Sequence, residues 1–267
     1  MTHTPRTVVI TGASSGIGRD AAALFAQRGD TVYDLSRSDK PQDGVVHIAC
    51  DVTQPATVAQ AFATIASKHS HIDILILCAG SGIAGSVEHT DLDDMRRQFD
   101  VNTFGPVTVL QSALPLLRAD GPTPRERRVV FVSSMAAVFG IPFQSMYSAT
   151  KAAVNALAFS LSNELHAQGI SVTVVMPGDV KTNFKRNTNL RGADIYPLMQ
   201  GAIGQMERDE ANGLSSVSVA RKVFRAATRR RAGLYYTSDF VSDVECLLQR
   251  LLPTRFALYV VRKMYHC

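Results

Sequence analysis

The sequence has few cysteines, and they follow no pattern typical of metal ligands or redox pairs. The four cysteines stand at positions 50, 78, 246 and 267, without a Cys-x-x-Cys spacing and without a Cys/His cluster at metal-ligand spacing. Cys50 and Cys78 fall at the ends of apolar runs, where a small buried thiol is the ordinary explanation. The sequence therefore predicts no metal site.

Long apolar runs and a leader segment are also lacking. No apolar run approaches the roughly 20 residues that a membrane-spanning helix needs. The segment Met1–Ile10 enters a strand-like run at once and leaves no room for a signal peptide. We therefore expect a cytoplasmic protein.

Charge of one sign is concentrated in only one place. The formal net charge is +5, and much of the excess lies in the run Arg221–Arg231. Elsewhere acidic and basic residues are mixed, and no basic stripe is interleaved with aromatic residues. We interpret the run as a solvated helix face and expect no nucleic-acid partner.

What is present is a folded-protein composition with a repeated strand–helix pattern. The chain has 267 residues, of which 46% are hydrophobic and 19% charged. The expected helices cover about 16–28, 55–67, 92–117 and 145–168. Apolar runs that do not alternate with polar residues are typical of a parallel sheet covered on both faces. The expected strands are Thr7–Ile10, Thr31–Leu35, Val45–Cys50, Ile72–Leu77, Val129–Ser133 and Ile170–Val175.

This alternation predicts an α/β fold, namely a Rossmann-type doubly wound parallel sheet with helices on both faces. The chain shows no internal repeat, linker or low-complexity segment, so residues 1–267 are expected to form a single domain.

A glycine-rich turn joins the first strand to the first helix. A helix N-terminus presents free N–H groups and a partial positive charge, which together favour a phosphate. Glycine allows close approach of the backbone and unusual dihedral angles. The position directly after a strand makes this turn a candidate dinucleotide site. Its expected cofactor-binding residues are Gly12, Ser14, Ser15, Gly16, Ile17 and Gly18.

The end of the second strand bears on the choice of cofactor. An acidic residue at the tip would bind the ribose 2′-hydroxyl, whereas a basic residue accommodates a 2′-phosphate. The strand ends in Tyr33-Asp34-Leu35-Ser36-Arg37, with Ser36 and Arg37 at the tip. Because the arginine fork suits a phosphate, we favour NADP(H) over NAD(H), with Asp34 as the feature that argues the other way.

Tyr147 and Lys151 form a candidate catalytic pair. Residues four apart on a helix lie on the same face. A tyrosine is a poor base at neutral pH, and a neighbouring ammonium lowers its pKa and makes proton exchange feasible. Ser134 follows a strand at its carboxyl end, where ligands bind in such sheets, and can hydrogen-bond the same substrate oxygen.

These residues together resemble the short-chain dehydrogenase/reductase family over about Thr7–Thr182. The turn TGASSGIG matches the family pattern TGxxxGxG, and Tyr147-x-x-x-Lys151 matches its catalytic pair. Cys78-Ala79-Gly80 stands where the family usually has Asn-Ala-Gly, so a thiol replaces an amide.

The resemblance implies a catalytic tetrad of Asn102, Ser134, Tyr147 and Lys151. In it, Ser134 positions the carbonyl, Tyr147 is the acid or base, Lys151 holds the ribose, and Asn102 helps to place a relay water. It also implies cofactor contacts from the segment after the third strand, from the Ala-Gly pair and from the PGxVxT-like segment. Those residues are Asp51, Val52, Ala79, Gly80, Tyr147, Lys151, Pro177, Gly178, Val180 and Thr182, in addition to Arg37 and the glycine turn.

The last third of the chain carries the expectations about substrate. We expect a substrate lid at about 183–213 and an apolar pocket beneath it. Packing of the pocket residues on the core is an equal alternative. The residues that could contribute to the pocket are Leu190, Ile195, Tyr196, Leu198, Met199, Ile203, Met206, Ile141, Phe143 and Met146. The extension at about 240–267 is apolar and basic. Packing on another subunit or domain is favoured for it over covering the substrate mouth or lying on a membrane.

The sequence therefore predicts an oxidoreductase that transfers a hydride between NADP(H) and a carbonyl or secondary alcohol of a hydrophobic substrate such as a steroid or retinoid. The alternatives are a 3-oxoacyl or small-ketone reductase and, from another class, a non-catalytic dinucleotide-binding sensor. By the same resemblance we expect a homodimer or homotetramer.

Overall fold

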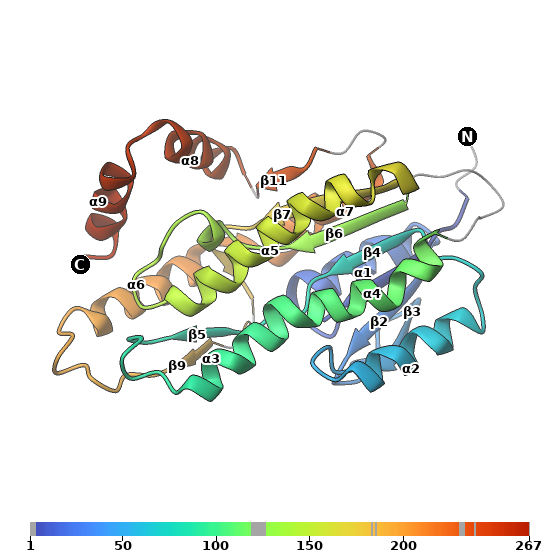
Figure 1. The fold of residues 1–267 in the computed structure, drawn as a ribbon, viewed down its shortest axis with the longest axis horizontal. Helices are drawn as coiled ribbons and strands as arrows, with labels where there is room; N and C mark the ends of the chain where they lie inside the picture. Colours follow the sequence, from blue (N-terminus) through green and yellow to red (C-terminus); the bar gives the residue numbers. More distant parts are fainter. Residues whose placement is uncertain are drawn as a thin grey trace.

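A seven-stranded parallel sheet forms the centre of the molecule (Figure 1). The computed structural model describes residues 4–118, 127–182, 184, 186–229, 233–237 and 239–266. The strand order is β11-β7-β6-β4-β1-β2-β3, which is a doubly wound arrangement. The strands are β1 (Thr7–Thr11), β2 (Thr31–Ser36), β3 (Val45–Ala49), β4 (Ile74–Leu77), β6 (Arg127–Val132), β7 (Ile170–Met176) and β11 (Tyr235–Thr237).

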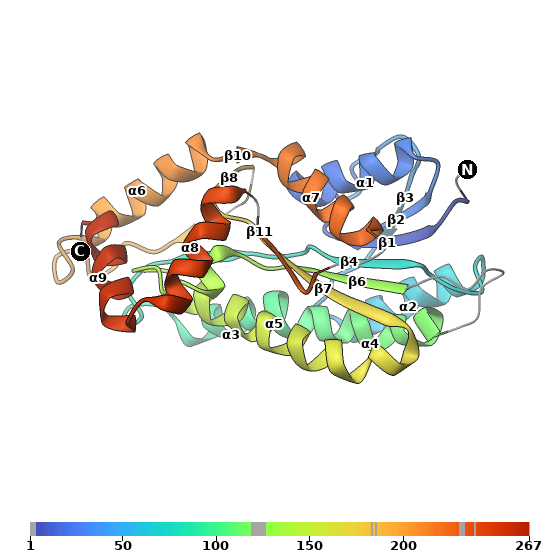
Figure 2. The same ribbon diagram turned by 90° about the horizontal axis from the view of Figure 1, so that it is seen from above.

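Helices cover both faces of this sheet (Figure 2). One face carries α1 (Gly16–Gln27) and α7 (Ser216–Thr228), and the other carries α2 (Pro55–Ala66), α4 (Gly105–Arg118) and α5 (Ser145–Glu164). The predicted Rossmann-type fold and its single domain are therefore confirmed.

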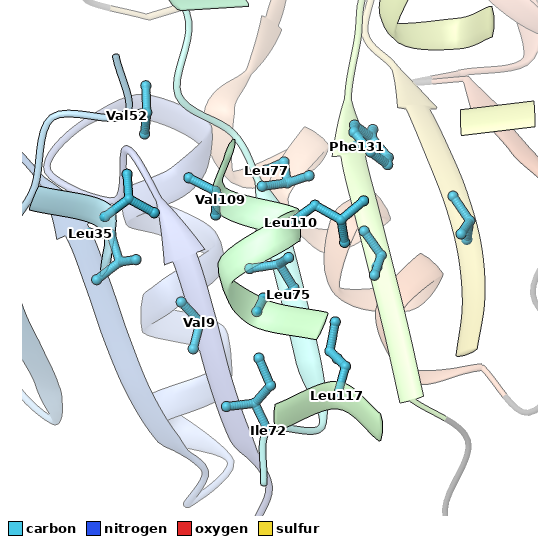
Figure 3. Packing of buried hydrophobic residues seen from close by; sticks show 14 of the residues in the cluster. Val9, Leu35, Val52, Ile72, Leu75, Leu77, Val109, Leu110, Leu117 and Phe131 are labelled. Carbon is cyan, nitrogen blue, oxygen red and sulfur yellow. The ribbon is translucent and has the colours of Figure 1, made fainter. Parts of the chain in front are cut away.

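The strands bury alternate side chains in two separate cores. Val9, Leu75 and Phe131 pack against α2, α4 and α5, and Figure 3 shows them beside α4, whereas Ile10 and Ile76 pack against α1 and α7. Because both faces of each central strand are covered, the strands need apolar residues at every position, which is why they read as unbroken apolar runs.

The long helix expected at 92–117 is divided into three parts. After α3 (Leu92–Phe99) comes a five-residue π-helical segment, Asp100–Phe104, before α4 begins. Inserted π turns are frequent at functional sites. Here the segment holds Asn102, whose amide side chain is bonded to the backbone of Ser81 in a neighbouring loop.

Other boundaries also differ from the expectations, most of them by one residue; strand β4 begins at Ile74, two residues after the expected start. The helix expected to reach Gln168 ends at Glu164, and a 3₁₀ turn then leads to Gly169, whose φ of 70° reverses the chain. Strand β6 begins at Arg127, two residues before the expected start. The pattern of apolar residues could not show this earlier start, because the first two residues of the strand, Arg127 and Arg128, are charged and yet buried.

Short strands and three helices lie at one end of the sheet, and all of them except β5 come from the carboxyl-terminal third of the chain. Strands β5 (Gly82–Ala84) and β9 (Arg186–Thr188) pair with each other, as do β8 (Val180–Lys181) and β10 (Leu214–Ser215). Helices α6 (Met199–Asn212), α8 (Phe240–Leu251) and α9 (Thr254–Met264) lie beyond the sheet (Figure 1). None of the helices among the described residues has the length and apolar content required to cross a membrane.

A buried ion pair ties the starts of three central strands together. The Asp73 carboxylate accepts the backbone N–H of Thr7 in β1 at 2.9 Å and the Arg127 guanidinium in β6 at 2.7 Å. The Asp73 carbonyl accepts the N–H of Arg128 at 2.9 Å. This cluster aligns β1, β4 and β6 from the edge of the sheet opposite their carboxyl ends.

Replacing Arg127 by methionine is expected to lower the free energy of unfolding by about 3–5 kcal/mol, because the Asp73 charge would stay buried without its cation. Urea denaturation measures this loss. The matched control is Arg97→Met, which removes an exposed cation from its pair with Asp94 and should cost less than about 1 kcal/mol. Equal losses in the two variants would contradict the role of the buried pair.

Candidate functional site

A cavity of about 600 Å³ opens at the carboxyl ends of the central strands. Ligands bind at this edge in doubly wound sheets, because the strand order reverses there. All the residues expected to bind the cofactor line it: Gly12, Ser14, Ser15, Gly16, Ile17, Gly18, Arg37, Asp51, Val52, Ala79, Gly80, Tyr147, Lys151, Pro177, Gly178, Val180 and Thr182. The described residues contain no group of three His, Cys, Asp or Glu side chains placed to hold a metal ion.

The glycine turn forms one wall of this cavity. Gly12 has a φ of +73°, and a Cβ there would lie 2.9 Å from the Ala79 Cα; a Cβ on Gly18 would lie 2.4 Å from the Gly12 carbonyl oxygen. Both positions therefore require glycine. The side chain of Ser15, the N-cap residue of α1, makes no capping bond, so this helix end faces the cavity without a side-chain cap. The turn fits the pyrophosphate of a dinucleotide.

The acidic residue of β2 is occupied inside the protein. One Asp34 oxygen accepts the Ala13 N–H at 2.9 Å, and the other accepts the Ser36 hydroxyl at 2.7 Å and lies 3.3 Å from the His47 ring. Asp34 is buried and absent from the cavity lining, whereas Arg37 lines it. Among the described residues, no carboxylate forms an ion pair with Arg37.

Asp51 also shapes the cofactor side of the cavity. Its carboxylate accepts the N–H of Thr53 at 3.0 Å and the Thr53 hydroxyl at 2.8 Å, which turns the chain after β3. Asp51 and Val52 are thereby held at the edge of the cavity, beyond the tip of β2.

Three members of the expected tetrad line the cavity together. Ser134 follows β6 and accepts the N–H of Ala136 at 3.1 Å, which fixes its hydroxyl at the start of a short 3₁₀ turn. This hydroxyl is close enough to the phenol of Tyr147 to lower its pKa. The Lys151 Nζ lies one helical turn further on, 5.8 Å from the centre of the Tyr147 ring, and donates to the Val132 carbonyl at 3.0 Å.

Asn102 lies behind the cavity and not in its wall. Its Oδ1 accepts the Ser81 N–H at 2.9 Å, and its Nδ2 donates to the Ser81 carbonyl at 2.9 Å and to the Thr150 hydroxyl at 3.1 Å. A Cβ on Gly80 would lie 3.5 Å from Asn102 Oδ1 and 3.7 Å from Lys151 Nζ. Gly80 thus keeps open the space between the amide and the ammonium.

The electrostatics of Tyr147 differ from the expectation that Lys151 lowers its pKa. Burial raises the pKa of the Tyr147 phenol, opposed by the hydrogen bond from Ser134 and by the positive charge of Arg186. Burial also lowers the pKa of Lys151 to about 8. The lysine ammonium is held by the Val132 carbonyl and not by the phenol. The phenol is therefore protonated at neutral pH.

The thiol that replaces the family's asparagine keeps the local turn intact. The backbone N–H groups of Cys78 and Ala79 donate to the Thr11 hydroxyl at 3.0 and 3.1 Å, so the turn after β4 is stabilised by a residue outside the replaced position. Burial raises the pKa of Cys78 to about 11, and the thiol is neutral at physiological pH. Cys78 is therefore a neutral neighbour of Lys151.

A phenylalanine and a cluster of charged residues that the sequence did not predict lie beside Tyr147. Phe184 packs edge-on against the Tyr147 ring, with 6.1 Å between ring centres. Beyond it, Arg186 forms an ion pair with Glu210, and Asp179 is close enough to raise the Tyr147 pKa. These residues come from separate segments, and no spacing in the sequence links them.

Helices α8 and α9 form the apolar wall of the cavity. The apolar lining residues are Leu248 of α8, Leu252 between the helices, and Phe256, Ala257, Val260, Val261 and Met264 of α9. The apolar character of this segment was visible in the sequence, but the break at Leu252–Pro253 means that no single helical period identifies the wall. Val261 and Tyr265 of α9 pack on Ala202 and Met206 of α6. The extension thus covers the cavity, whereas the sequence favoured packing of the extension on another subunit or domain.

Most of the apolar residues proposed for the lid do not reach the cavity. Of that set, Ile141 and Met206 line it. Met199 and Ile203 are buried against Ala84, and Tyr196 donates a hydrogen bond to Glu88 at 2.8 Å. Leu190, Ile195 and Leu198 are exposed. Neither Phe143 nor Met146 is part of the lining. The alternative of core packing is therefore correct for Met199 and Ile203.

The Asp179→Asn substitution is expected to stabilise the protein at neutral pH. Burial and the nearby carboxylates of Asp209 and Glu210 raise the Asp179 pKa from 3.8 to about 6, so the folded state binds this proton more tightly than the unfolded chain. The charged form therefore opposes folding above about pH 6. Asp179 faces a cavity that water can enter, so we expect a gain of only about 1 kcal/mol.

Chemical denaturation of the wild type and the Asn variant at several pH values checks this. The gain should be full above about pH 6 and should disappear as the pH falls toward 3.8. Asp93→Asn, on an exposed face of α3, is the matched control and should show no such trend. A gain that is independent of pH would contradict the assignment.

Comparison with known proteins identifies the family. A model of the short chain dehydrogenase family matches residues 6–192. A 3-ketodihydrosphingosine reductase of Bacteroides thetaiotaomicron is 32% identical, over 98% of this chain and 98% of its own length. Dehydrogenase/reductase SDR family member 7B of Mus musculus is 30% identical, over 93% of this chain and 78% of its own.

A solved structure shows the same fold along the whole chain. The short-chain dehydrogenase from Streptomyces avermitilis is 26% identical, with a TM-score of 0.81 over 100% of this chain and 99% of that one. The chain belongs to the short-chain dehydrogenase/reductase family, and it is an NAD(P)-dependent oxidoreductase that acts on alcohol or carbonyl groups.

Proposed function

We propose that this protein is an NADP(H)-linked reductase of a long-chain, lipophilic ketone, and that it interconverts this ketone with the secondary alcohol. The observation that carries the proposal is one continuous cavity. It joins the glycine turn, the Ser134–Tyr147–Lys151 group and the apolar wall of α8 and α9. A ketone at Tyr147 could therefore extend its hydrocarbon chain along Leu252, Phe256 and Val260.

The chain's own residues then have distinct roles. Bound cofactor supplies the hydride. Ser134 orients the carbonyl oxygen through its hydroxyl, and Tyr147 donates the proton to that oxygen. The raised pKa of Tyr147 keeps the phenol protonated at neutral pH, which is the form that a proton donor needs. Lys151, held by the Val132 carbonyl, binds the cofactor ribose and electrostatically favours the phenolate left after proton transfer. Asn102 is a positioning residue behind them.

The charges beside Tyr147 favour a substrate that carries an amino group near its ketone. Asp179, Glu210 and Glu245 line the cavity there, against the single guanidinium of Arg186. The excess of carboxylates would attract an ammonium and repel a carboxylate or phosphate. A similar relative is named a 3-ketodihydrosphingosine reductase, which supports a long-chain amino ketone. Steroids, retinoids, 3-oxoacyl compounds and small ketones are the alternatives.

Two features support NADP(H) as the cofactor. The Asp34 carboxylate is committed to Ala13, Ser36 and His47, so its oxygens are engaged away from a ribose. The Arg37 guanidinium lies at the cavity edge beside Ser38. An arginine at this position binds a 2′-phosphate. We also propose that the protein is cytoplasmic and that it forms a homodimer or homotetramer. Light scattering, which measures the mass of the assembly, tests the oligomeric state.

Tyr147→Phe is expected to lower kcat by about 10²–10⁴-fold, because the ketone oxygen loses its proton donor, while the Kd for NADPH changes by less than about threefold. Oxidation of NADPH is followed against long-chain amino ketones, steroids, retinoids, 3-oxoacyl esters and small ketones. Tyr196→Phe, a matched change outside the cavity, should keep full activity. Wild-type activity on none of the panel, or an unchanged rate in the Phe variant, would refute the proposal.

Arg37→Ala is expected to raise the KM for NADPH by about tenfold or more and to leave the KM for NADH within about twofold, because only NADPH has the 2′-phosphate. Steady-state kinetics with both cofactors measure the ratio. Arg97→Ala on the exposed face of α3 is the control for loss of one positive charge. If both cofactors lose affinity equally, Arg37 does not read the 2′-phosphate.

A further inference from the structure

An apolar stripe runs along the outer face of α8. Phe240, Val244, Leu247 and Leu251 are spaced four, three and four residues apart, so they share one side of the helix. Phe240, Leu247 and Leu251 are 79%, 56% and 71% exposed. We call these four residues the α8 stripe. In the part of the chain that the structure describes, nothing covers it, and contiguous exposed apolar surface of this kind marks interaction sites.

The opposite face of α8 is the one that packs on the protein. Ser242 is buried, and the Cys246 sulfur lies 3.7 Å from the Met135 sulfur. Glu245 and Gln249 line the cavity. The helix is therefore oriented with its more polar side inward and its apolar stripe outward. This orientation is the reverse of that of an ordinary surface helix of a globular protein.

The outer face of α9 is cationic. Val261 and Tyr265 pack on α6, and on the other side of the helix Arg255, Tyr259, Arg262 and Lys263 are exposed. Helix α9 contains no acidic residue. The two helices are joined at Leu252–Pro253, so the apolar stripe and the cationic face follow one another directly, and Figure 1 shows both helices at the margin of the molecule, beyond the sheet.

We propose that the α8 stripe and the cationic face of α9 dock this protein peripherally on an anionic lipid bilayer. The apolar side chains enter the boundary between headgroups and acyl chains, and the cations meet the anionic headgroups. Tyr259 has the polar tip and apolar ring that suit this boundary. The same two helices and their connection form the cavity wall, through Leu248 of α8, Leu252 between the helices and Phe256 of α9, so the docked face is continuous with the cavity.

Charge complementarity favours a bilayer over a second copy of the chain. A two-fold contact would place the same patch on both sides, so the cations of α9 from both copies would enter one interface. The acidic residues of this region are already engaged. Asp239 caps α8 by accepting the Ser242 N–H at 2.7 Å, Asp243 accepts the Thr237 hydroxyl at 2.6 Å, and Glu245 faces the cavity.

The docked helices could also give the substrate a route from the bilayer into the cavity. This route rests on the proposed function, whereas the docking does not. If the substrate is a long-chain amino ketone, it resides in a bilayer, and helices that both touch the bilayer and line the cavity give it a path that avoids water. The docking itself depends only on the surface of α8 and α9.

The experiment is sedimentation of the full chain with lipid vesicles. We expect binding to phosphatidylcholine vesicles containing about 30% phosphatidylglycerol, and at least tenfold weaker binding to pure phosphatidylcholine or at high salt. The triple variants Phe240→Ser/Leu247→Ser/Leu251→Ser and Arg255→Glu/Arg262→Glu/Lys263→Glu should each bind at least about tenfold more weakly. None of these residues lines the cavity.

The matched control is Leu92→Ser/Arg96→Glu, which changes an exposed leucine and an exposed arginine on α3 and should bind vesicles like the wild type. Thermal unfolding midpoints verify that every variant is folded. Absence of vesicle binding, equal binding by the stripe variant, or a wild-type dimer that the stripe variant disperses would overturn the proposal. Because sedimentation needs no turnover, an inactive protein that still binds vesicles would refute the proposed function alone.

Discussion

The close approach of the Gly12 and Ala79 backbones is the constraint on which the site depends. The Thr11 hydroxyl accepts the N–H groups of Cys78 and Ala79, which draws the end of β4 against the end of β1. On the other side, the Gly12 N–H donates to the Leu35 carbonyl at 2.9 Å and ties β1 to β2. With no side chain at Gly12, three strand ends meet closely enough for the backbone itself to form the floor of the cofactor site.

Bonds to the backbone hold Lys151 and Asn102 in a buried position, and burial explains the unusual electrostatics of the reacting groups. Lys151 is buried and donates to the Val132 carbonyl, while the Ser133 hydroxyl donates to the Lys151 carbonyl at 3.2 Å, so α5 is joined to the end of β6 at two points. Asn102 joins the π-helical segment to the loop after β4 in the same way. Burial then raises the pKa of Tyr147 and lowers that of Lys151, which favours the neutral forms until cofactor and substrate supply new partners.

The carboxyl-terminal helices connect the chemistry to the proposed lipid environment. The cavity-facing side of α9, together with Leu248 of α8, supplies the apolar wall of the cavity, and the outer faces carry the α8 stripe and the cations of α9. This pair of helices therefore has apolar surface both toward the cavity and toward the outside, and such surface is costly in water unless it has a partner. A lipophilic substrate inside and a bilayer outside would satisfy both sides with one structural element, which gives the proposed substrate class and the proposed docking surface a common physical basis.

Local chemistry predicted the fold from the sequence alone, and together with the family resemblance it predicted the reaction. Buried parallel strands need apolar residues throughout, the pyrophosphate turn needs glycine at fixed positions, and one helical turn brings Tyr147 and Lys151 together; each rule acts within a few residues. The same rules could not show the buried Arg127 of β6, because a charged residue is accepted in a core only when a distant partner such as Asp73 meets it.

Tertiary structure decided everything that depends on segments far apart in the chain. It removed Asp34 from the cavity by surrounding it with Ala13, Ser36 and His47, and it placed Arg186, Glu210 and Asp179 beside Tyr147. It also turned the polar side of α8 inward and left the stripe outside. Periodicity in a sequence gives the faces of a helix, but which face is buried follows from what the rest of the fold presents to it, and only the folded chain contains that information.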